Sequence, residues 1–229
     1  MKLVIYSALT LSAPFSLLTE QWQKQQPDTR LEIRWHPSTV IEKTLRQGEQ
    51  ADLVIATVAT VSNLIQSGLA DAGSRIELVD SPIGIAVVEG APKPDISSRD
   101  RLVESLLAAR SVAWSEAGAS GVWFSQLMKQ LGIDQELRSR GTVIPAGFTA
   151  EQLVKGNADL AVQQISELLM VRGIDIAGPL PPGTQQPISI SAAVLARAEL
   201  PARAGEFLAW LKQPQVTEIF TQFGLVRRD

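Results

Sequence analysis

Hydroxyl and amide side chains gather where the predicted strands end. They follow the apolar runs at residues 2–7, 31–36, 110–115 and 159–164, and they are Ser7, Thr10, Ser12, Ser38, Thr39, Ser120, Gln163, Gln164 and Ser166. In open parallel sheets, ligands bind beyond the carboxyl ends of the strands, where helix N-termini direct backbone N–H groups outwards. Such a ring can bind a small anion without a cationic side chain. Ser and Thr also cap helices in the absence of any ligand, each adding about 1 kcal/mol, so the prediction depends on the convergence of several.

The pair Gln163 and Gln164 lies at a predicted junction between a strand and an amphipathic helix, in the stretch "DLAVQQISELL" at 159–169. Neighbouring residues on a strand point to opposite faces, so only one of the two can easily reach a ligand. We expect the other to tie a loop or hinge in place. An amide can donate to a carboxylate and accept from a hydroxyl. The pair therefore suits an organic acid better than a bare tetrahedral oxyanion.

Two residues are candidates for a catalytic base, although neither is assigned. His36 is the only histidine and follows the second predicted strand, where it could titrate near neutral pH or be an exposed strand-end residue. Glu116 is the second candidate. Glu116 and Glu167 both fall near the loops expected to face a ligand, but a surface carboxylate is the commoner explanation for either. Three aromatic residues could shape a pocket or belong to the core: Trp114, Trp123 and Phe148.

Composition excludes several other chemistries. The 229 residues carry a net charge of −3 with no basic cluster, which argues against nucleic acid as a partner. Cysteine is absent, which excludes disulfides, thiolate zinc sites, iron–sulfur ligation and a cysteine nucleophile. With one histidine, a transition-metal site would need carboxylates alone. No Walker lysine motif, G-x-G-x-x-G fingerprint or G-x-S-x-G elbow occurs, so we expect neither a metal nor a cofactor.

The first 18 residues resemble a signal peptide because Lys2 precedes an apolar run. The run is interrupted by Ser7, Thr10, Ser12 and Pro14, so it is too polar for a membrane span and better interpreted as a strand followed by a helix. We expect no direct insertion into a membrane. The protein would be periplasmic if a signal peptide has been removed and cytoplasmic if Met1 is the native start.

Short apolar runs alternate with segments of helical period, which predicts parallel sheets covered by helices. Two extended runs follow each other at 75–90, and a loop-rich stretch at 178–187 precedes a long strand at 188–196. We interpret these as two crossings between lobes. The predicted fold class is α/β, with lobe 1 formed by 1–80 plus 190–229 and lobe 2 by 81–189. A ligand cleft is expected between them.

Three stretches resemble the type II periplasmic solute-binding proteins, specifically the molybdate-binding-protein-like group. They are "YSALTLSAPFSLL", "HPSTVIEKTLRQGEQADLVIAT" and "PQVTEIFTQFGL". The likeness covers nearly the whole chain and implies two Rossmann-like lobes joined by a two-segment hinge. The group's oxyanion-binding positions correspond to Thr10, Ser38, the Ala119–Gly121 turn, the Ala146–Phe148 loop and Gln164. Gln164 replaces the tyrosine of the molybdate binders. Together with "GIAVVEGAPKPDIS" and "VQQISELL", this departure resembles a side branch of substrate-binding proteins that includes aconitate isomerase.

The resemblance implies three functions. The first is binding of a small anion, a dicarboxylate or tricarboxylate, with an ABC-transporter permease as partner if the protein is exported. The second is isomerisation of an unsaturated carboxylic acid by a proton shift, with His36 or Glu116 as base. The third is binding of molybdate or tungstate. The expected ligand-binding residues are Ser7, Thr10, Leu11, Ser38, Thr39, Ala119, Ser120, Gly121, Gly147, Phe148, Gln163 and Gln164.

Overall fold

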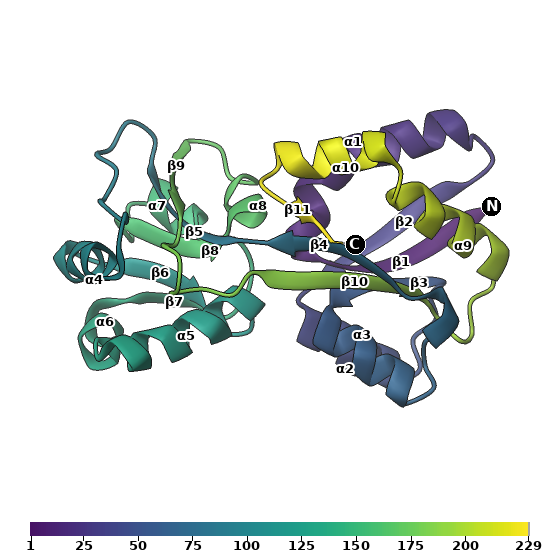
Figure 1. Cartoon of the computed structure of the whole chain (residues 1–229), viewed down its shortest axis with the longest axis horizontal. Helices are drawn as coiled ribbons and strands as arrows, with labels where there is room; N and C mark the ends of the chain where they lie inside the picture. The colour runs from purple at the N-terminus through teal and green to yellow at the C-terminus, as the bar shows by residue number, and fades with distance from the viewer. Residues whose placement is uncertain (229) are drawn as a thin grey trace. The chain divides into compact units, whose positions relative to one another are not determined.

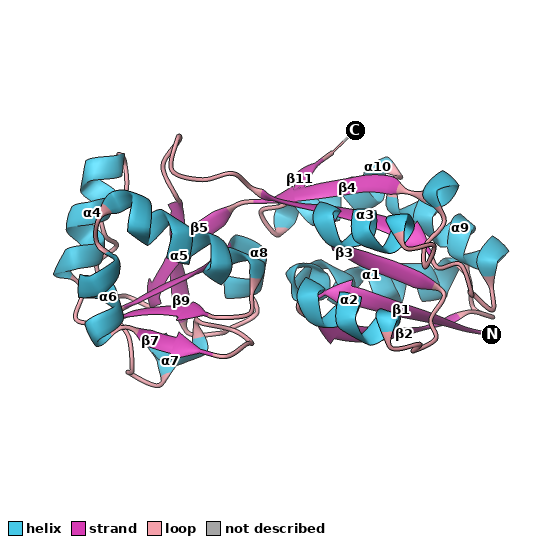
Figure 2. Ribbon diagram, turned by 90° about the horizontal axis from the view of Figure 1, so that it is seen from below, coloured by secondary structure: helices cyan, strands magenta, loops and turns pink. Residues whose placement is uncertain are grey.

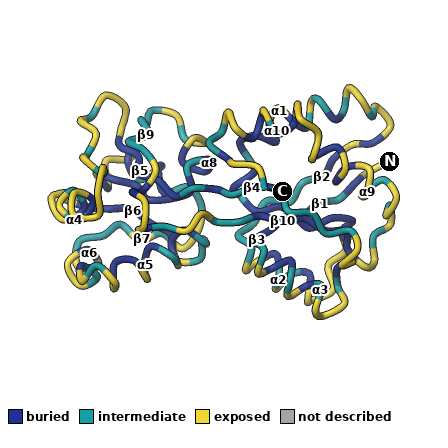
Figure 3. Tube along the Cα trace, viewed as in Figure 1, coloured by how far each residue is buried: buried dark blue, intermediate teal, exposed yellow. Residues whose placement is uncertain are grey.

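The computed structural model describes residues 1–228, which divide into two compact α/β units. Unit 1 comprises residues 1–81 and the segment from 189 onwards, and unit 2 comprises residues 82–188. The lobes predicted at 1–80 with 190–229 and at 81–189 differ from these ranges by one residue at each crossing. Each unit has its own sheet and its own buried core, and the central strands of both sheets are among the buried segments (Figure 3).

Unit 1 contains a six-stranded sheet in the order β11-β4-β10-β3-β1-β2. Its strands are β1 (Lys2–Ala8), β2 (Arg30–His36), β3 (Leu53–Thr57), β4 (Ile76–Ser81), β10 (Ile188–Val194) and β11 (Val226–Arg227). Its helices are α1 (Ser12–Gln25), α2 (Ser38–Arg46), α3 (Val58–Gln66), α9 (Pro201–Leu211) and α10 (Pro214–Gln222), with 3-10 turns η1 (Leu9–Leu11) and η2 (Ala72–Ser74). β1, β2 and β3 are parallel to one another.

Helices cover both faces of the unit 1 sheet (Figure 1). On one face, Ile41 and Leu45 of α2 and Val61 and Leu64 of α3 pack against β3. On the other, α1, α9 and α10 lie together (Figure 1), with an aromatic cluster formed by Phe15, Trp22, Phe207 and Trp210. The continuous apolar strands at residues 3–6 and 53–56 are explained by this double cover, because both faces of a central strand are buried.

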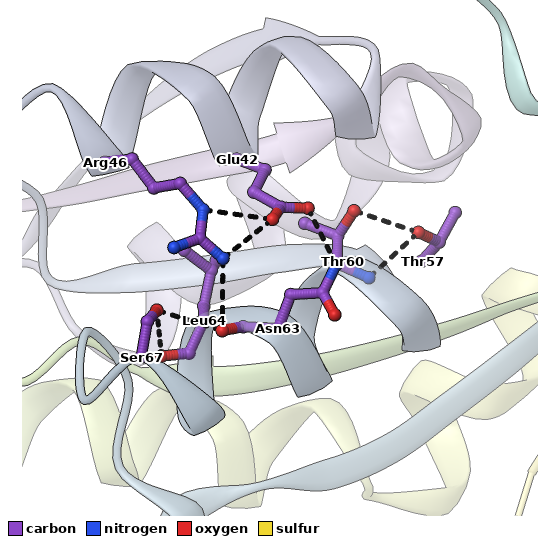
Figure 4. A network of polar contacts seen from close by, with 7 residues as sticks. All are labelled: Glu42, Arg46, Thr57, Thr60, Asn63, Leu64 and Ser67. Carbon is purple, nitrogen blue, oxygen red and sulfur yellow. Dashed lines mark hydrogen bonds and ion pairs between the residues drawn. The ribbon is translucent and has the colours of Figure 1, made fainter.

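Polar contacts join α2 to α3 at the surface (Figure 4). Glu42 accepts hydrogen bonds from Arg46 on its own helix, at 3.0 and 2.9 Å, and from the Asn63 amide of α3, at 3.2 Å. At the start of α3, the Thr57 hydroxyl caps the helix by accepting from the Thr60 backbone N–H at 3.4 Å. These contacts hold α2 and α3 side by side.

Unit 2 contains a five-stranded sheet in the order β7-β6-β8-β5-β9. Its strands are β5 (Ile83–Val88), β6 (Val112–Ser115), β7 (Thr142–Ile144), β8 (Leu160–Gln164) and β9 (Ile174–Pro179). Its helices are α4 (Arg99–Ala108), α5 (Ala119–Leu131), α6 (Asp134–Arg140), α7 (Glu151–Val154) and α8 (Ile165–Leu168), all shown in cyan in Figure 2. β6, β7 and β8 are parallel, so their carboxyl ends meet at one edge.

The two faces of the unit 2 sheet carry side chains of different size. Large residues such as Trp114 and Val162 face α4, α5 and α6 in one cluster. Alanines at 86, 113 and 161 face α7 and α8 in another. Alternation along each strand produces this division, and the small face admits short helices close to the sheet.

Both sheets are mixed, which corrects the prediction of parallel sheets. In unit 1, β10 runs antiparallel to β3, and in unit 2, β5 runs antiparallel to β8 and β9. The reason is the crossings. Ile83, just after the first crossing, pairs with Gln164 at the carboxyl end of β8, and Ile190, just after the second, pairs with Thr57 at the carboxyl end of β3. The chain thus enters each unit at the edge where the parallel strands end.

The helix predicted after β8 is shorter than its apolar pattern suggests. α8 ends at Leu168, and residues 169–173 form turns that lead into β9. Gly173, with φ of 81°, allows the chain to reverse so that Ile174 pairs with Val88. Leu168 is buried on the sheet, whereas Leu169 and Met170 are exposed, so the amphipathic spacing of residues 165–171 does not correspond to a long helix.

Asp52 links three elements of unit 1, and its loss should destabilise the protein. The buried carboxylate accepts from the backbone N–H of Val4 at 2.8 Å and of Leu200, the N-cap of α9, at 2.9 Å. We expect Asp52→Ala to lower the free energy of unfolding by about 3 kcal/mol, because two partly buried donors lose a buried, charged acceptor. The control is Asp71→Ala, an exposed cap of η2, with an expected cost of about 1 kcal/mol or less. Urea unfolding followed by circular dichroism measures both, and equal losses would contradict the assignment.

Candidate functional site

The carboxyl edge of the unit 1 sheet carries one group of the predicted ligand-binding residues. Ala8, at the end of β1, pairs with His36, at the end of β2, so both strands end at the same level. The Ser38 hydroxyl accepts from the Thr57 backbone N–H at 3.1 Å, which joins the start of α2 to the end of β3. The structure thus brings Ser7, Thr10, Leu11, Ser38 and Thr39 to one edge of one sheet.

Burial separates these residues into different possible roles. Ser7 and Thr10 are buried, and Leu11 is completely buried, so Leu11 can offer a ligand only its backbone. Thr39 is exposed and Ser38 is half-buried. Ser7 also donates a hydrogen bond to the Ala8 carbonyl at 3.3 Å, so its hydroxyl already has an acceptor within the strand.

His36 is engaged with its neighbours in the sheet. Its ring stacks on Tyr6, with ring centroids 6.0 Å apart and planes 26° apart. The Tyr6 hydroxyl in turn accepts from Arg34 at 3.1 Å, and this hydrogen bond raises the pKa of the Arg34 guanidinium. His36 is half-buried at the strand end. The stacking gives the imidazole a structural partner.

Among the described residues at the two carboxyl edges, the N-termini of α1, α2 and α5 have no side-chain cap. The N-cap residues of α1, α2 and α5 are Leu11, Pro37 and Gly118, and none accepts a hydrogen bond through its side chain. By contrast, α3 and α4 are capped by Thr57 and Ser98. Uncapped N-terminal N–H groups carry the partial positive charge of the helix and are suited to an anion.

The start of α5 has two buried hydroxyls that find no hydrogen-bond partner within residues 1–228, those of Ser115 and Ser120. Each side chain is 1% exposed. Glycines pack the turn tightly around them, since a Cβ atom at Gly118 would collide with the Ser115 hydroxyl and one at Gly121 with the Ser115 carbonyl oxygen. A buried hydroxyl without a partner costs about 1–3 kcal/mol, so this arrangement is costly unless something binds there.

Gln163 ties a loop in place within unit 2. Its side-chain oxygen accepts from the Thr149 backbone N–H at 2.8 Å and from the Thr149 hydroxyl at 2.9 Å, and its amide nitrogen donates to the Gly147 carbonyl at 2.9 Å. Gln163 is buried. These bonds hold the loop that carries Gly147 and Phe148, both half-buried. Gln163 therefore positions this loop, and its polar groups already have partners inside unit 2.

Gln164 is directed differently and forms a buried pair with Glu167. Its amide nitrogen donates to a carboxylate oxygen of Glu167 at 3.0 Å. Glu167 is only 6% exposed and Gln164 is 3% exposed. The sequence pattern favours a surface position for Glu167, and burial overturns that interpretation. The apolar run that follows does not reveal this burial, because Leu169 and Met170 are exposed while Glu167 is buried.

The other candidate residues have simpler surroundings. Glu116 is exposed, and only its backbone N–H has a described bond, to Ile144 at 2.8 Å. Trp114 belongs to the unit 2 core, and Trp123 packs against it. Within residues 1–228, no group of three or more His, Asp or Glu side chains could hold a metal ion. No helix in that range is long and apolar enough to cross a membrane.

Gln163→Leu should destabilise the protein and loosen the 147–149 loop. The substitution removes three hydrogen bonds and leaves the buried Thr149 N–H without an acceptor, so we expect a loss of about 2–3 kcal/mol in unfolding free energy. Urea unfolding measures stability, and amide hydrogen exchange measures loop opening. Gln130→Leu, at an exposed position on α5, is the matched control with an expected change within about 0.5 kcal/mol. Unchanged exchange at Thr149 would show that Gln163 does not hold the loop.

Known proteins resemble this chain along nearly its whole length. The sequence profile of the family described as bacterial extracellular solute-binding protein matches residues 3–226. An aconitate isomerase from a Pseudomonas species is 34% identical over 186 residues, which are 81% of this chain and 71% of that protein. The residues of the two carboxyl edges lie within the range that the family profile matches.

Solved structures share the fold at lower identity. The periplasmic molybdate-binding protein of Azotobacter vinelandii superposes with a TM-score of 0.83 at 20% identity, covering 99% of this chain and 100% of that one. A sulfate-binding protein of Mycobacterium tuberculosis H37Rv gives 0.76 at 16% identity, covering 100% and 88%. The chain has the two-lobed α/β fold of the periplasmic binding proteins. It belongs to the bacterial extracellular solute-binding protein family.

Proposed function

We propose that this protein binds a small organic anion with two or three carboxylates, as the solute-binding component of an ABC-type uptake system. The observation that carries the proposal is the start of α5, where Ser115 and Ser120 are buried without hydrogen-bond partners beside uncapped N–H groups. A carboxylate oxygen bound at this turn would accept hydrogen bonds from the Ser120 hydroxyl and the helix N-terminus. That would remove the cost of the buried hydroxyl.

The unit 1 edge supports the same class of ligand. α1 and α2 begin there without side-chain caps, and the hydroxyls of Thr10 and Ser38 lie at these starts. No lysine or arginine is needed to bind an anion at such helix starts. The expectation that both units serve a single ligand stays a prediction from the sequence.

The buried Gln164–Glu167 pair favours an organic acid over molybdate or sulfate. A carboxylate at the same edge of the unit 2 sheet would repel a compact oxyanion. A polycarboxylate is longer, and it can place its charges at the α5 start while its carbon skeleton or a protonated group lies near Glu167. The relative with 34% identity is named for a tricarboxylate, whereas the molybdate and sulfate binders are at most 20% identical and share the fold alone.

Isomerisation is the second candidate function. Its specific support is the similarity to aconitate isomerase over 81% of the chain, together with a carboxylate buried where a ligand would bind. A function in solute binding requires that the protein is exported and has a permease partner, so we propose a periplasmic location for that case. A function as an isomerase requires only the bound acid and a group that moves a proton.

A ligand screen separates these possibilities. We expect citrate, cis-aconitate or trans-aconitate to raise the melting temperature by about 5–10 °C at 100 times its Kd. Molybdate, tungstate and sulfate should produce no shift. The measurement is a thermal-shift assay over all six anions, followed by calorimetry of those that stabilise. Stabilisation by molybdate alone would refute the proposal for an organic acid.

Ser120→Ala should weaken binding without destabilising the fold. The hydroxyl has no partner within the described chain, so its removal should not lower the free energy of unfolding and should raise it by about 1–3 kcal/mol, the cost of a buried hydroxyl without a partner. Ligand affinity should fall about five- to tenfold, equivalent to about 1–1.4 kcal/mol. Ser125→Ala, one turn further along α5, is the control. If the affinity of Ser120→Ala for the stabilising carboxylate equals that of the wild type, Ser120 is not part of the site.

A further inference from the structure

We propose that Glu167 is a catalytic residue that transfers a proton between two carbon atoms of an unsaturated polycarboxylate. This inference depends on the proposed function, because it requires that such an acid binds at the carboxyl edge of unit 2. It replaces His36 and Glu116 as candidate bases. His36 stacks on Tyr6, and Glu116 is exposed.

The position of Glu167 fits this role. β6 and β8 are parallel neighbours, so the start of α5, after β6, and the start of α8, after β8, lie at the same edge of the sheet. The α5 start offers donors for a carboxylate, and the α8 start offers the Glu167 carboxylate. An acid that spans the two would place donors at one end and a base near its carbon skeleton.

The burial of Glu167 also fits proton transfer between carbons. The side chain is 6% exposed, and the Gln164 amide fixes one carboxylate oxygen at 3.0 Å. A base that is shielded from water keeps the abstracted proton and can return it to the same molecule. Holding the carboxylate in one orientation also fixes the direction of abstraction.

The proposed step balances without any co-reactant. The Glu167 carboxylate removes a proton from the methylene carbon that lies next to the double bond and carries a carboxylate. The C–H electrons form a new double bond, and the former double-bond electrons move towards the far carbon and its carboxylate. Protonated Glu167 then gives its proton to that far carbon. The double bond has moved by one position, and the Glu167 carboxylate is restored. Donors at the α5 start would stabilise the charge that develops on the substrate carboxylate.

A structural role for Glu167 makes a different prediction. Glu167 is the third residue of α8, and Gln164 is its N-cap, so the carboxylate could serve only to hold the helix start. That role needs an acceptor oxygen, which glutamine also provides. Glu167→Gln therefore keeps the acceptor and removes the ability to take a proton.

The experiment follows trans-aconitate by ¹H NMR in the presence of the full-length protein, with affinity measured separately by calorimetry. We expect the wild type to convert trans-aconitate to cis-aconitate. Glu167→Gln should lower kcat at least 100-fold and change the Kd for trans-aconitate less than tenfold. Glu167→Asp, which keeps a carboxylate, should retain more activity than Glu167→Gln. Glu104→Gln, at an exposed position on α4, should match the wild type, and thermal unfolding checks that each variant folds.

The outcomes distinguish the two proposals. If no carboxylate in the screen binds the wild type, the proposed function fails, and the role of Glu167 fails with it. If trans-aconitate binds but is not converted, binding stands and the role of Glu167 is refuted. If conversion occurs and Glu167→Gln retains more than a tenth of the wild-type kcat, isomerisation stands and Glu167 is not its base. If Glu167→Gln does not fold, the Glu167→Asp variant decides between the two roles. A wild-type kcat in Glu167→Asp, together with a Kd for trans-aconitate raised more than tenfold, would refute the proposal.

Discussion

The point at which the chain enters each sheet is the constraint on which the candidate site depends. Both crossings deliver the chain to the carboxyl edge of the parallel strands, and this forces β5 to run antiparallel to β8 and β10 to run antiparallel to β3. Helices that follow the parallel strands begin at that same edge. The hinge segments and the helix N-termini are therefore brought together in each unit by topology alone, before any side chain is chosen.

The side chains at these edges then decide which anion can bind. Unit 1 supplies hydroxyls and uncapped helix starts, and unit 2 supplies the same kinds of group at the Ser115–Gly121 turn. Neutral hydrogen-bond donors of this kind can bind many different anions. Under the proposed function, the buried carboxylate of Glu167 is the group that discriminates between anions, since it would disfavour a compact dianion at unit 2 and tolerate an extended acid.

The sequence predicts the strands well because their apolar runs report double burial directly, as at residues 3–6 and 53–56. The two crossings are predicted from consecutive extended runs and from a loop-rich stretch. Strand direction is not predicted, because antiparallel β5 has the same apolar pattern as a parallel strand and only its pairing with Gln164 reveals the reversal. The alternation rule correctly implies that Gln163 and Gln164 have different partners, while the burial of Glu167 depends on a turn at residues 169–173 that periodicity does not show.

Binding and proton transfer place closely related demands on this edge. Donors at a helix start that bind a carboxylate in the ground state bind it more strongly once negative charge is delocalised onto it, and only this difference accelerates a reaction. A binding site of this type therefore already stabilises a dienolate to some extent. What it lacks is a group that can take and return a proton without losing it to water. In the role proposed for Glu167, a single buried carboxylate whose orientation is fixed by a neighbouring amide would provide that group. A solute-binding protein and an isomerase would then differ by one residue on the same fold.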